Sequence, residues 1–207
     1  MTAKPTTAGT VVVLSGGRAR RLGQAKALID LQGRSAMRVL LDAVPSETPV
    51  IVVGECAPDV GRSVQVLREE PVFSGPLHAL GTAVSQAVST DSFITLAVDL
   101  PLVTTQTLAL LPKLGVSAAE PYPQAVLPVD ASGRRQALAG AYDTQAVRAG
   151  IAKLGTTVDR PMAALLDHLV VLEVPIDRAE AANYLDIDTP TDLALTRRRL
   201  RRTQPLT

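Results

Sequence analysis

The sequence predicts a three-layer α/β fold with a mainly parallel, mixed central sheet. Apolar runs such as Thr10–Leu14 alternate along the chain with segments of helical periodicity, which is the pattern of a sheet covered by helices. These runs are continuously apolar, as expected for strands that are buried on both faces of a sheet. A chain of 207 residues with 46% hydrophobic content can bury a substantial core within one domain.

The first half of the chain carries the clearest elements. Its first helix is indicated by apolar residues at helical spacing, which share one helix face: Met37, Leu40, Leu41 and Val44. Further helices are expected over Leu77–Val88 and Thr104–Leu114. Besides Thr10–Leu14, buried strands are predicted at Val50–Val53, at Val64–Leu67 and, in the centre of the sheet, at Phe93–Val98.

The second half is less regular and ends in a well-marked helix. Strands are expected at Ala125–Val129, Leu138–Tyr142 and Leu169–Val174, with helices over about 144–154 and 162–168. The last helix begins with Thr189 as its N-cap, Pro190 at the first helical position and Asp192 at the acidic position of a capping box.

Composition excludes several classes of function. We predict a flexible tail over 1–9 and a single domain over 10–202, without an internal repeat or linker. A net charge of +1 and 2% aromatic residues give no reason to expect a nucleic-acid or membrane partner. The only cysteine, Cys56, has no disulfide partner within the chain, and no apolar run reaches the length of a membrane span. These features predict a cytoplasmic protein.

A glycine-rich cationic loop follows the first strand, in the stretch LSGGRARRLGQAK from Leu14 to Lys26. Its glycines let backbone N–H groups approach an anion closely, and its cations supply positive charge: Gly16, Gly17, Gly23, Arg18, Arg20, Arg21 and Lys26. The spacing matches neither of the two common phosphate-binding loops. We predict that the loop binds a polyphosphate, in preference to an ordinary solvated connection.

Three other segments follow predicted strands and carry chemically useful residues. Asp99 ends the Phe93–Val98 strand, where a carboxylate beside a phosphate loop suits Mg²⁺, although it could also cap the turn before Pro101. Gly75 opens a helix after Glu69 and would admit a flat base, although a helix start without a ligand is equally compatible. Because successive side chains of an extended segment alternate between its faces, Asp186 and Asp188 lie on the same face. Either could approach the metal, or the two residues could simply cap the last helix.

These segments together carry a family resemblance that spans nearly the whole chain. The loop resembles the signature L-[AS]-G-G-x-x-x-R-[ML]-G-x-[DP]-K of nucleotidyltransferases with a Rossmann-like, GT-A-type fold. SGPLHAL, AVDLP, RRQALAGAY and DIDTPTDL are similar to the G-P-L-A-G, C-D-M-P, R-x-Q-P-L-x-A-L-Y and N-V-N-T-P-E-D-L segments of the molybdenum cofactor guanylyltransferases. The chain departs at Ala25, where an acid is common, at Asp186 and Asp188, where asparagines stand, and at Glu69, where Asp is common.

The resemblance implies that GTP, bound with Mg²⁺, transfers GMP to the terminal phosphate of molybdopterin. It implies that the backbone of Leu14, Ser15, Gly16 and Gly17 holds the nucleotide, and that Arg18 and Arg21 hold its phosphates. Lys26 would stabilise charge at the α-phosphorus and the leaving pyrophosphate, and Asp99 would hold Mg²⁺ with Asp188 as second metal ligand. Glu69 and Gly75 would line the base or ribose pocket, and 134–136 would face the acceptor.

Other interpretations stay open at this point. The chain could use CTP or a sugar phosphate with the same loop and Asp99, or it could be a non-catalytic nucleotide-binding protein. The arginine cluster over 197–202 could form a nucleic-acid patch, but such a cluster is typical of a solvated helix C-terminus. We assign packing or surface roles to His78, His168 and Cys56. A monomer or weak homo-oligomer is expected, with possible transient contacts to other molybdenum cofactor biosynthesis proteins.

Overall fold

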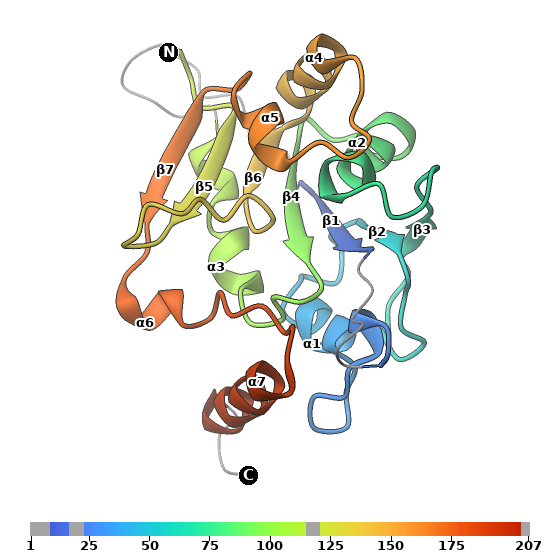
Figure 1. The fold of residues 1–207 in the computed structure, drawn as a ribbon, viewed down its shortest axis with the longest axis vertical. Coiled ribbons are helices and arrows are strands. Elements are labelled where there is room, and N and C mark those ends of the chain that lie inside the picture. Colours follow the sequence, from blue (N-terminus) through green and yellow to red (C-terminus); the bar gives the residue numbers. More distant parts are fainter. Residues whose placement is uncertain (1–8, 17–22, 115–120, 204–207) are drawn as a thin grey trace.

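The computed structural model describes residues 9–16, 23–114 and 121–203, and these form one seven-stranded sheet in the order β3-β2-β1-β4-β6-β5-β7. Figure 1 shows the strands side by side from β7 at the left to β3 at the right. Their bounds are β1 (Thr10–Ser15), β2 (Val50–Gly54), β3 (Gln65–Leu67), β4 (Ser92–Ala97), β5 (Ala125–Val129), β6 (Ala141–Asp143) and β7 (Val171–Pro175). Of these strands, β6 alone runs antiparallel to its neighbours, which confirms the predicted mainly parallel, mixed sheet.

Helices cover both faces of the sheet. They are α1 (Ala36–Asp42), α2 (Pro76–Gln86), α3 (Thr104–Leu108), α4 (Thr144–Leu154), α5 (Met162–Leu166), α6 (Arg178–Ala181) and α7 (Pro190–Thr203), with short 3-10 helices η1 (Lys26–Leu28) and η2 (Leu111–Lys113). Val11 and Val13 of β1 point into one apolar cluster with α1 and α3. Val12 and Leu14 point into a second cluster with α2, α4 and α5. The predicted three layers are therefore present.

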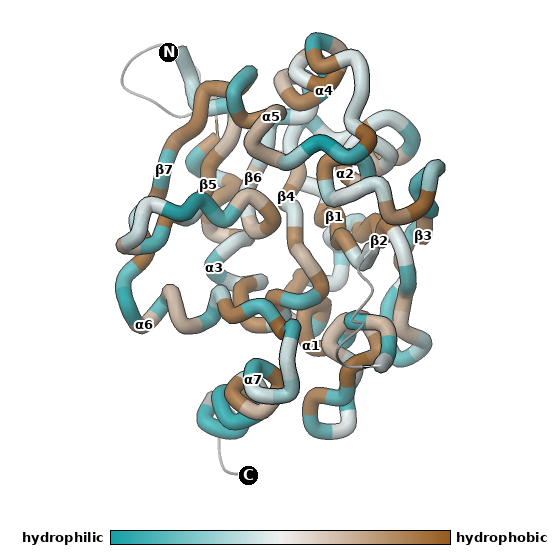
Figure 2. The backbone as a smooth tube through the Cα atoms, viewed as in Figure 1, coloured by the Kyte–Doolittle hydropathy of each residue, from teal (hydrophilic) through white to brown (hydrophobic). Residues whose placement is uncertain are grey.

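The apolar runs become strands because both of their faces are covered. Every residue of β1 and β4 is buried, and the hydrophobic colour in Figure 2 gathers along the central strands. Across the antiparallel pair, Phe93 of β4 lies opposite Tyr142 of β6, and their rings stack with centroids 5.6 Å apart. Such stacking adds to the burial of two large side chains.

Four predicted elements need correction. The helix expected over Thr104–Leu114 ends at Leu108 and is followed by the separate turn η2, because Pro112 lacks the N–H that a continuous helix requires. Strand β3 is not buried, since it lies at the sheet edge with two of its residues exposed. Strand β6 starts at Ala141 instead of Leu138, and β7 spans Val171–Pro175.

The C-terminal helix is tied back to the body of the protein. The predicted capping box is confirmed: Asp192 Oδ2 accepts from Thr189 N at 2.8 Å, and Thr189 Oγ1 accepts from Asp192 N at 3.2 Å. Ile187 and Leu200 pack in a third apolar cluster with α1. The segment that precedes α7 is thereby held against the strand ends, below which α7 lies in Figure 1.

At the N-terminal end, residues 1–8 of the predicted tail lie outside the described residues, whereas Gly9 is buried against Leu111. The domain boundary at residue 202 stays a prediction. Among the helices of the described ranges, none combines the length and the apolar character that crossing a membrane requires.

Candidate functional site

The candidate site lies at the carboxyl ends of the parallel strands. The register pairs Ser15 of β1 with Gly54 of β2 and Leu14 with Ala97 of β4. Val98 N then donates to Leu14 O at 3.1 Å, so the glycine-rich loop and the Asp99 segment leave the sheet side by side. Ligands of open α/β folds bind at this edge.

Lys26 is the centre of a charged cluster at this edge. Its Nζ lies 2.7 Å from Asp99 Oδ2 and 2.6 Å from Asp188 Oδ1, and its side chain is 13% exposed. Burial by itself lowers the pKa of Lys26, but the charges and hydrogen bonds of the two carboxylates outweigh burial and raise the pKa above its usual value. Lys26 therefore carries its positive charge at neutral pH.

The two carboxylates come from distant segments that the backbone joins. Asp99 follows β4, and its carbonyl accepts a hydrogen bond from Ile187 N at 3.0 Å. This bond places Asp188 beside Asp99, although Asp188 belongs to the segment before α7. The structure therefore brings Asp99 and Asp188 together with the Lys26 ammonium between them, and their role as metal ligands stays a prediction.

Asp186 faces the same cluster and extends it toward Arg134. Burial, followed by the charge of Asp99, raises the pKa of Asp186, while Arg134 opposes that shift. The ion pair between Arg134 Nη2 and Asp186 Oδ2 is long, at 3.7 Å. Arg135 pairs instead with Glu173 on β7, and Gln136 is buried. Of the predicted acceptor residues 134–136, Arg134 is the one that approaches the charged cluster.

Glu69 lies beside Gly16, where the glycine-rich loop begins. It is 6% exposed, and its Oε1 accepts from Phe73 N at 2.7 Å. A Cβ placed on Gly16 would lie 3.6 Å from that same oxygen, so Glu69 borders the glycine-rich loop. Its second oxygen, Oε2, is buried and finds no hydrogen-bond partner among the described residues. A buried carboxylate oxygen without a partner is energetically costly unless a ligand supplies the donor.

Gly75 forms the N-cap of α2, close to Glu69 in the chain. Its φ of 92° lies in the region that favours glycine. Apart from its chain neighbours, no atom of the described residues lies within 4 Å of the position that a Cβ would take. The backbone is therefore open to a flat ligand at this point. The N-terminus of this 11-residue helix also favours negative charge nearby.

Sequence reasoning missed Gly54 at the end of β2. Its φ is 113°, and a Cβ there would lie 2.7 Å from Ser15 C and 2.9 Å from Gly16 N. Only glycine lets β2 approach the start of the loop so closely. The available signal was a glycine directly after the apolar run Val50–Val53.

The remaining predicted residues divide into two groups. Leu14 and Ser15 end β1 and are buried, and Gly16 follows them at the surface. Ser15 Oγ is buried with no hydrogen-bond partner in the described part of the chain. Gly17, Arg18 and Arg21 lie outside the described residues, so their predicted contacts with phosphates stay predictions.

Comparisons with known proteins agree with this architecture. The "Probable molybdenum cofactor guanylyltransferase" of Mycobacterium marinum is 34% identical over 189 residues, which cover 88% of this chain and 90% of the relative. The molybdopterin-guanine dinucleotide biosynthesis protein A of Archaeoglobus fulgidus superposes with a TM-score of 0.69 at 19% identity, covering 94% and 100% of the two chains. The 2-C-methyl-D-erythritol 4-phosphate cytidylyltransferase of Thermus thermophilus gives 0.67 at 18% identity, covering 94% and 100%.

These structural likenesses show a shared Rossmann-like nucleotidyltransferase fold. The sequence evidence is more specific, because one family model matches residues 11–173. That range contains the glycine-rich loop, Glu69, Gly75, Asp99 and Arg134. The chain belongs to the family of the MobA-like NTP transferase domain.

Proposed function

We propose that this protein transfers GMP from GTP to the terminal phosphate of molybdopterin, forming molybdopterin guanine dinucleotide and pyrophosphate. The observation that carries the proposal is the position of Lys26, held between Asp99 and Asp188 at the end of the glycine-rich loop. This places a positive charge and two carboxylates where a triphosphate would leave the loop. The names of the relatives support GTP and molybdopterin as the two substrates.

The donor set is suited to Mg²⁺. Asp99 and Asp188 each direct a carboxylate oxygen to the Lys26 ammonium at the end of the loop. Mg²⁺ in phosphate-transfer sites takes one or two carboxylates besides phosphate oxygens and water. The described residues contain no group of three or more His, Cys, Asp or Glu that could hold a metal by themselves. We propose Asp99 as the main ligand and Asp188 as the second. When bound, the ion neutralises phosphate charge and so favours attack at the α-phosphorus.

The chain's own residues would then align and stabilise the reactants. An anionic oxygen of the acceptor phosphate forms a bond to the α-phosphorus of GTP, and the bond from that phosphorus to the bridging oxygen of the β-phosphate breaks. The electron pair leaves with pyrophosphate, and no proton has to be removed. Lys26, charged at neutral pH, stabilises the negative charge that grows on the leaving group. Arg18 and Arg21 are proposed to bind the outer phosphates.

The base would lie over Gly75, with Glu69 at its edge. Glu69 Oε1 is engaged by Phe73 N, whereas Oε2 has no partner in the described ranges. We propose that Oε2 accepts a hydrogen bond from the 2-amino group of guanine. A site built to pair with one polar group strongly rejects an analogue that lacks it, so this contact would select GTP.

The acceptor would lie on the Arg134 side of the charged cluster. Arg134 is largely exposed and only loosely paired with Asp186, at 3.7 Å. Its guanidinium is therefore available to a phosphate, which arginine binds with matched geometry.

We also propose that the protein is cytoplasmic and that Cys56 is a free thiol. We propose that it acts as a monomer or weak homo-oligomer, with transient contacts to proteins that deliver molybdopterin.

Pyrophosphate release tests the proposal directly. The full chain is supplied with Mg²⁺, molybdopterin and, in separate reactions, GTP, CTP, ATP or UTP. We expect release with GTP to exceed release with each other nucleotide, and to require molybdopterin. A preference for CTP would replace guanylyl by cytidylyl transfer, and release with a sugar phosphate in place of molybdopterin would overturn the acceptor. Nucleotide binding without release would identify a non-catalytic binding protein.

A further inference from the structure

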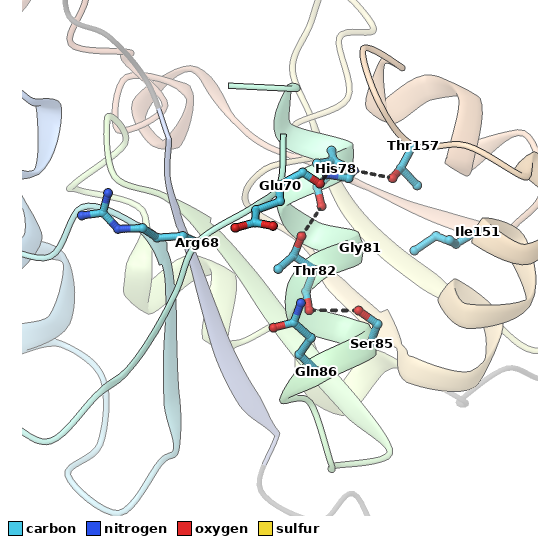
Figure 3. Close-up of a pocket in the computed structure, with 9 residues that line it drawn as sticks. All are labelled: Arg68, Glu70, His78, Gly81, Thr82, Ser85, Gln86, Ile151 and Thr157. Carbon is cyan, nitrogen blue, oxygen red and sulfur yellow. Dashed lines mark hydrogen bonds between the residues drawn. The ribbon is translucent and has the colours of Figure 1, made fainter. Parts of the chain in front are cut away.

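A groove of about 490 Å³ lies between α2 on one side and α4 with the loop that follows it on the other. The residues that line it come from the 68–70 segment around Glu69, from α2, from α4 and from the loop after α4, and Figure 3 shows them. His78 lies at one end of the groove and points toward Thr157. The proposed nucleotide contacts lie outside the groove, because neither Glu69 nor Gly75 lines it.

His78 connects three segments through its ring. Its Nδ1 lies 2.8 Å from Thr157 Oγ1, and its Nε2 lies 2.8 Å from the carbonyl oxygen of Glu70. A carbonyl only accepts, so Nε2 must carry a hydrogen, and in the neutral ring Nδ1 then accepts from the Thr157 hydroxyl. The ring therefore links the first turn of α2 to the residue next to Glu69 and to the loop after α4.

A second hydrogen bond joins the 69–75 segment to the loop after α4. Asp159 N donates to Ser74 O at 2.9 Å, and Ser74 is buried, with its hydroxyl donating to Pro71 O at 2.8 Å. The 69–75 segment is thus attached to the loop after α4 at both of its ends, through Glu70 and through Ser74. Phe73 N, which binds Glu69 Oε1, lies between these two attachments.

From these contacts we propose that His78 and Thr157 are positioning residues for the nucleotide base. They hold the 69–75 segment so that Glu69 Oε2 and the open face of Gly75 meet the same ligand. This inference rests on the proposed base pocket and adds to it a remote determinant of base selection. His78 thereby acquires a role beyond the packing or surface role expected from the sequence.

Thr157→Val tests the link, because it removes the hydroxyl and keeps the branched shape, while Thr157→Ser keeps the hydroxyl. A lost hydrogen bond of this kind corresponds to about a three- to tenfold change in an equilibrium. We expect Thr157→Val to raise the KM for GTP by about that factor, with kcat nearly unchanged and with weaker discrimination between GTP and inosine triphosphate, which lacks the 2-amino group. Thr157→Ser should behave as the wild type does.

The matched control is Ser85→Ala. Ser85 lines the same groove, and its hydroxyl donates to Thr82 O at 3.1 Å without contacting the 69–75 segment. The KM of Ser85→Ala for GTP and its discrimination between GTP and inosine triphosphate should equal those of the wild type. In addition, His78→Ala and Thr157→Val should be non-additive, because each removes the same link.

Amide hydrogen exchange gives a readout that needs no ligand. Exchange at Phe73 N should accelerate in Thr157→Val and not in Thr157→Ser or Ser85→Ala, because local opening becomes easier when the link is lost. Unchanged exchange at Phe73 N together with unchanged nucleotide discrimination would overturn the inference. If the wild type prefers a nucleotide other than GTP, the proposed function fails, while faster exchange in Thr157→Val alone would still support the positioning role.

Discussion

The two ends of the candidate site are built in opposite ways. At the reaction end, Lys26 meets Asp99 and Asp188, which lie 73 and 162 residues away in the sequence. At the base end, Glu69 binds the amide of Phe73, only four residues away. Each carboxylate of the first cluster is paired with the Lys26 ammonium, whereas one oxygen of Glu69 is buried without a partner in the described part of the chain.

This difference separates reaction chemistry from substrate choice. A cluster whose charged groups are already paired is stable without ligand, and these groups can exchange their partners within the protein for phosphate and metal when the nucleotide binds. A buried carboxylate oxygen without a partner instead favours whichever ligand supplies the missing donor. We therefore propose that the reaction end accepts any nucleoside triphosphate and that the base end selects among them.

The largest effect is expected at Lys26. Lys26→Ala removes the charge that stabilises the leaving group, and we expect kcat for pyrophosphate release to fall by about 10²–10³-fold. Lys153→Ala, at an exposed lysine of α4, is the matched control and should keep wild-type kcat. A Lys26→Ala enzyme within twofold of the wild type would remove Lys26 from the catalytic role.

Substitutions of the two carboxylates, Asp99 and Asp188, should lower kcat by different amounts. Asp99→Asn should lower kcat by about a hundredfold and raise the Mg²⁺ concentration needed for half-maximal rate, because a main metal ligand is lost. Asp188, with 54% of its side chain exposed against 23% for Asp99, should matter less, so Asp188→Asn should keep most of the activity. Magnesium titrations of both variants measure this, and equal losses would contradict the assigned order of ligands.

Glu69→Gln tests the base end. Its amide nitrogen cannot accept a hydrogen bond, so we expect kcat/KM for GTP to fall about tenfold and the preference for GTP over inosine triphosphate to narrow. The melting temperature should not fall, because the substitution removes a buried charge that lacks one partner. If kcat/KM falls by the same factor for GTP and inosine triphosphate, Glu69 contacts the ribose instead of the base.

The smallest effect concerns stability at Asp186. Its pKa is raised above 3.8, first by burial and then by the charge of Asp99, so the folded protein binds this proton more tightly than the unfolded chain. Ionisation of Asp186 therefore lowers the free energy of unfolding as pH rises through the raised pKa. We expect Asp186→Asn to raise the melting temperature at pH 7 by about 1–2 °C.

Thermal melts between pH 8 and pH 3.5 would follow this gain, which should shrink as the pH falls through the raised pKa toward 3.8. Asp167→Asn, at an exposed carboxylate after α5, serves as the control and should show no such trend. A gain that stays constant across this range would point to packing instead of ionisation.

Much of the fold was predictable because local patterns control it. The runs that became β1, β2, β4 and β5 consist mostly of apolar residues, and the start of α7 follows from Thr189, Pro190 and Asp192. The end of the helix at Leu108 could also have been predicted from the sequence, because Pro112 follows it. The position of β3 at the edge was not, because neighbours in the sheet decide whether a short apolar strand is covered.

The sequence by itself indicated the reaction class, because glycines and charges directly after apolar strands must meet at one sheet edge, and the roles proposed for the individual residues stay predictions. Only the tertiary structure decided how those residues are paired. It placed Lys26 between Asp99 and Asp188, and it left Glu69 Oε2 without a partner among the described residues. It also joined His78 to Thr157. Such pairings depend on distances of a few ångströms between segments far apart in the chain, which no local pattern encodes.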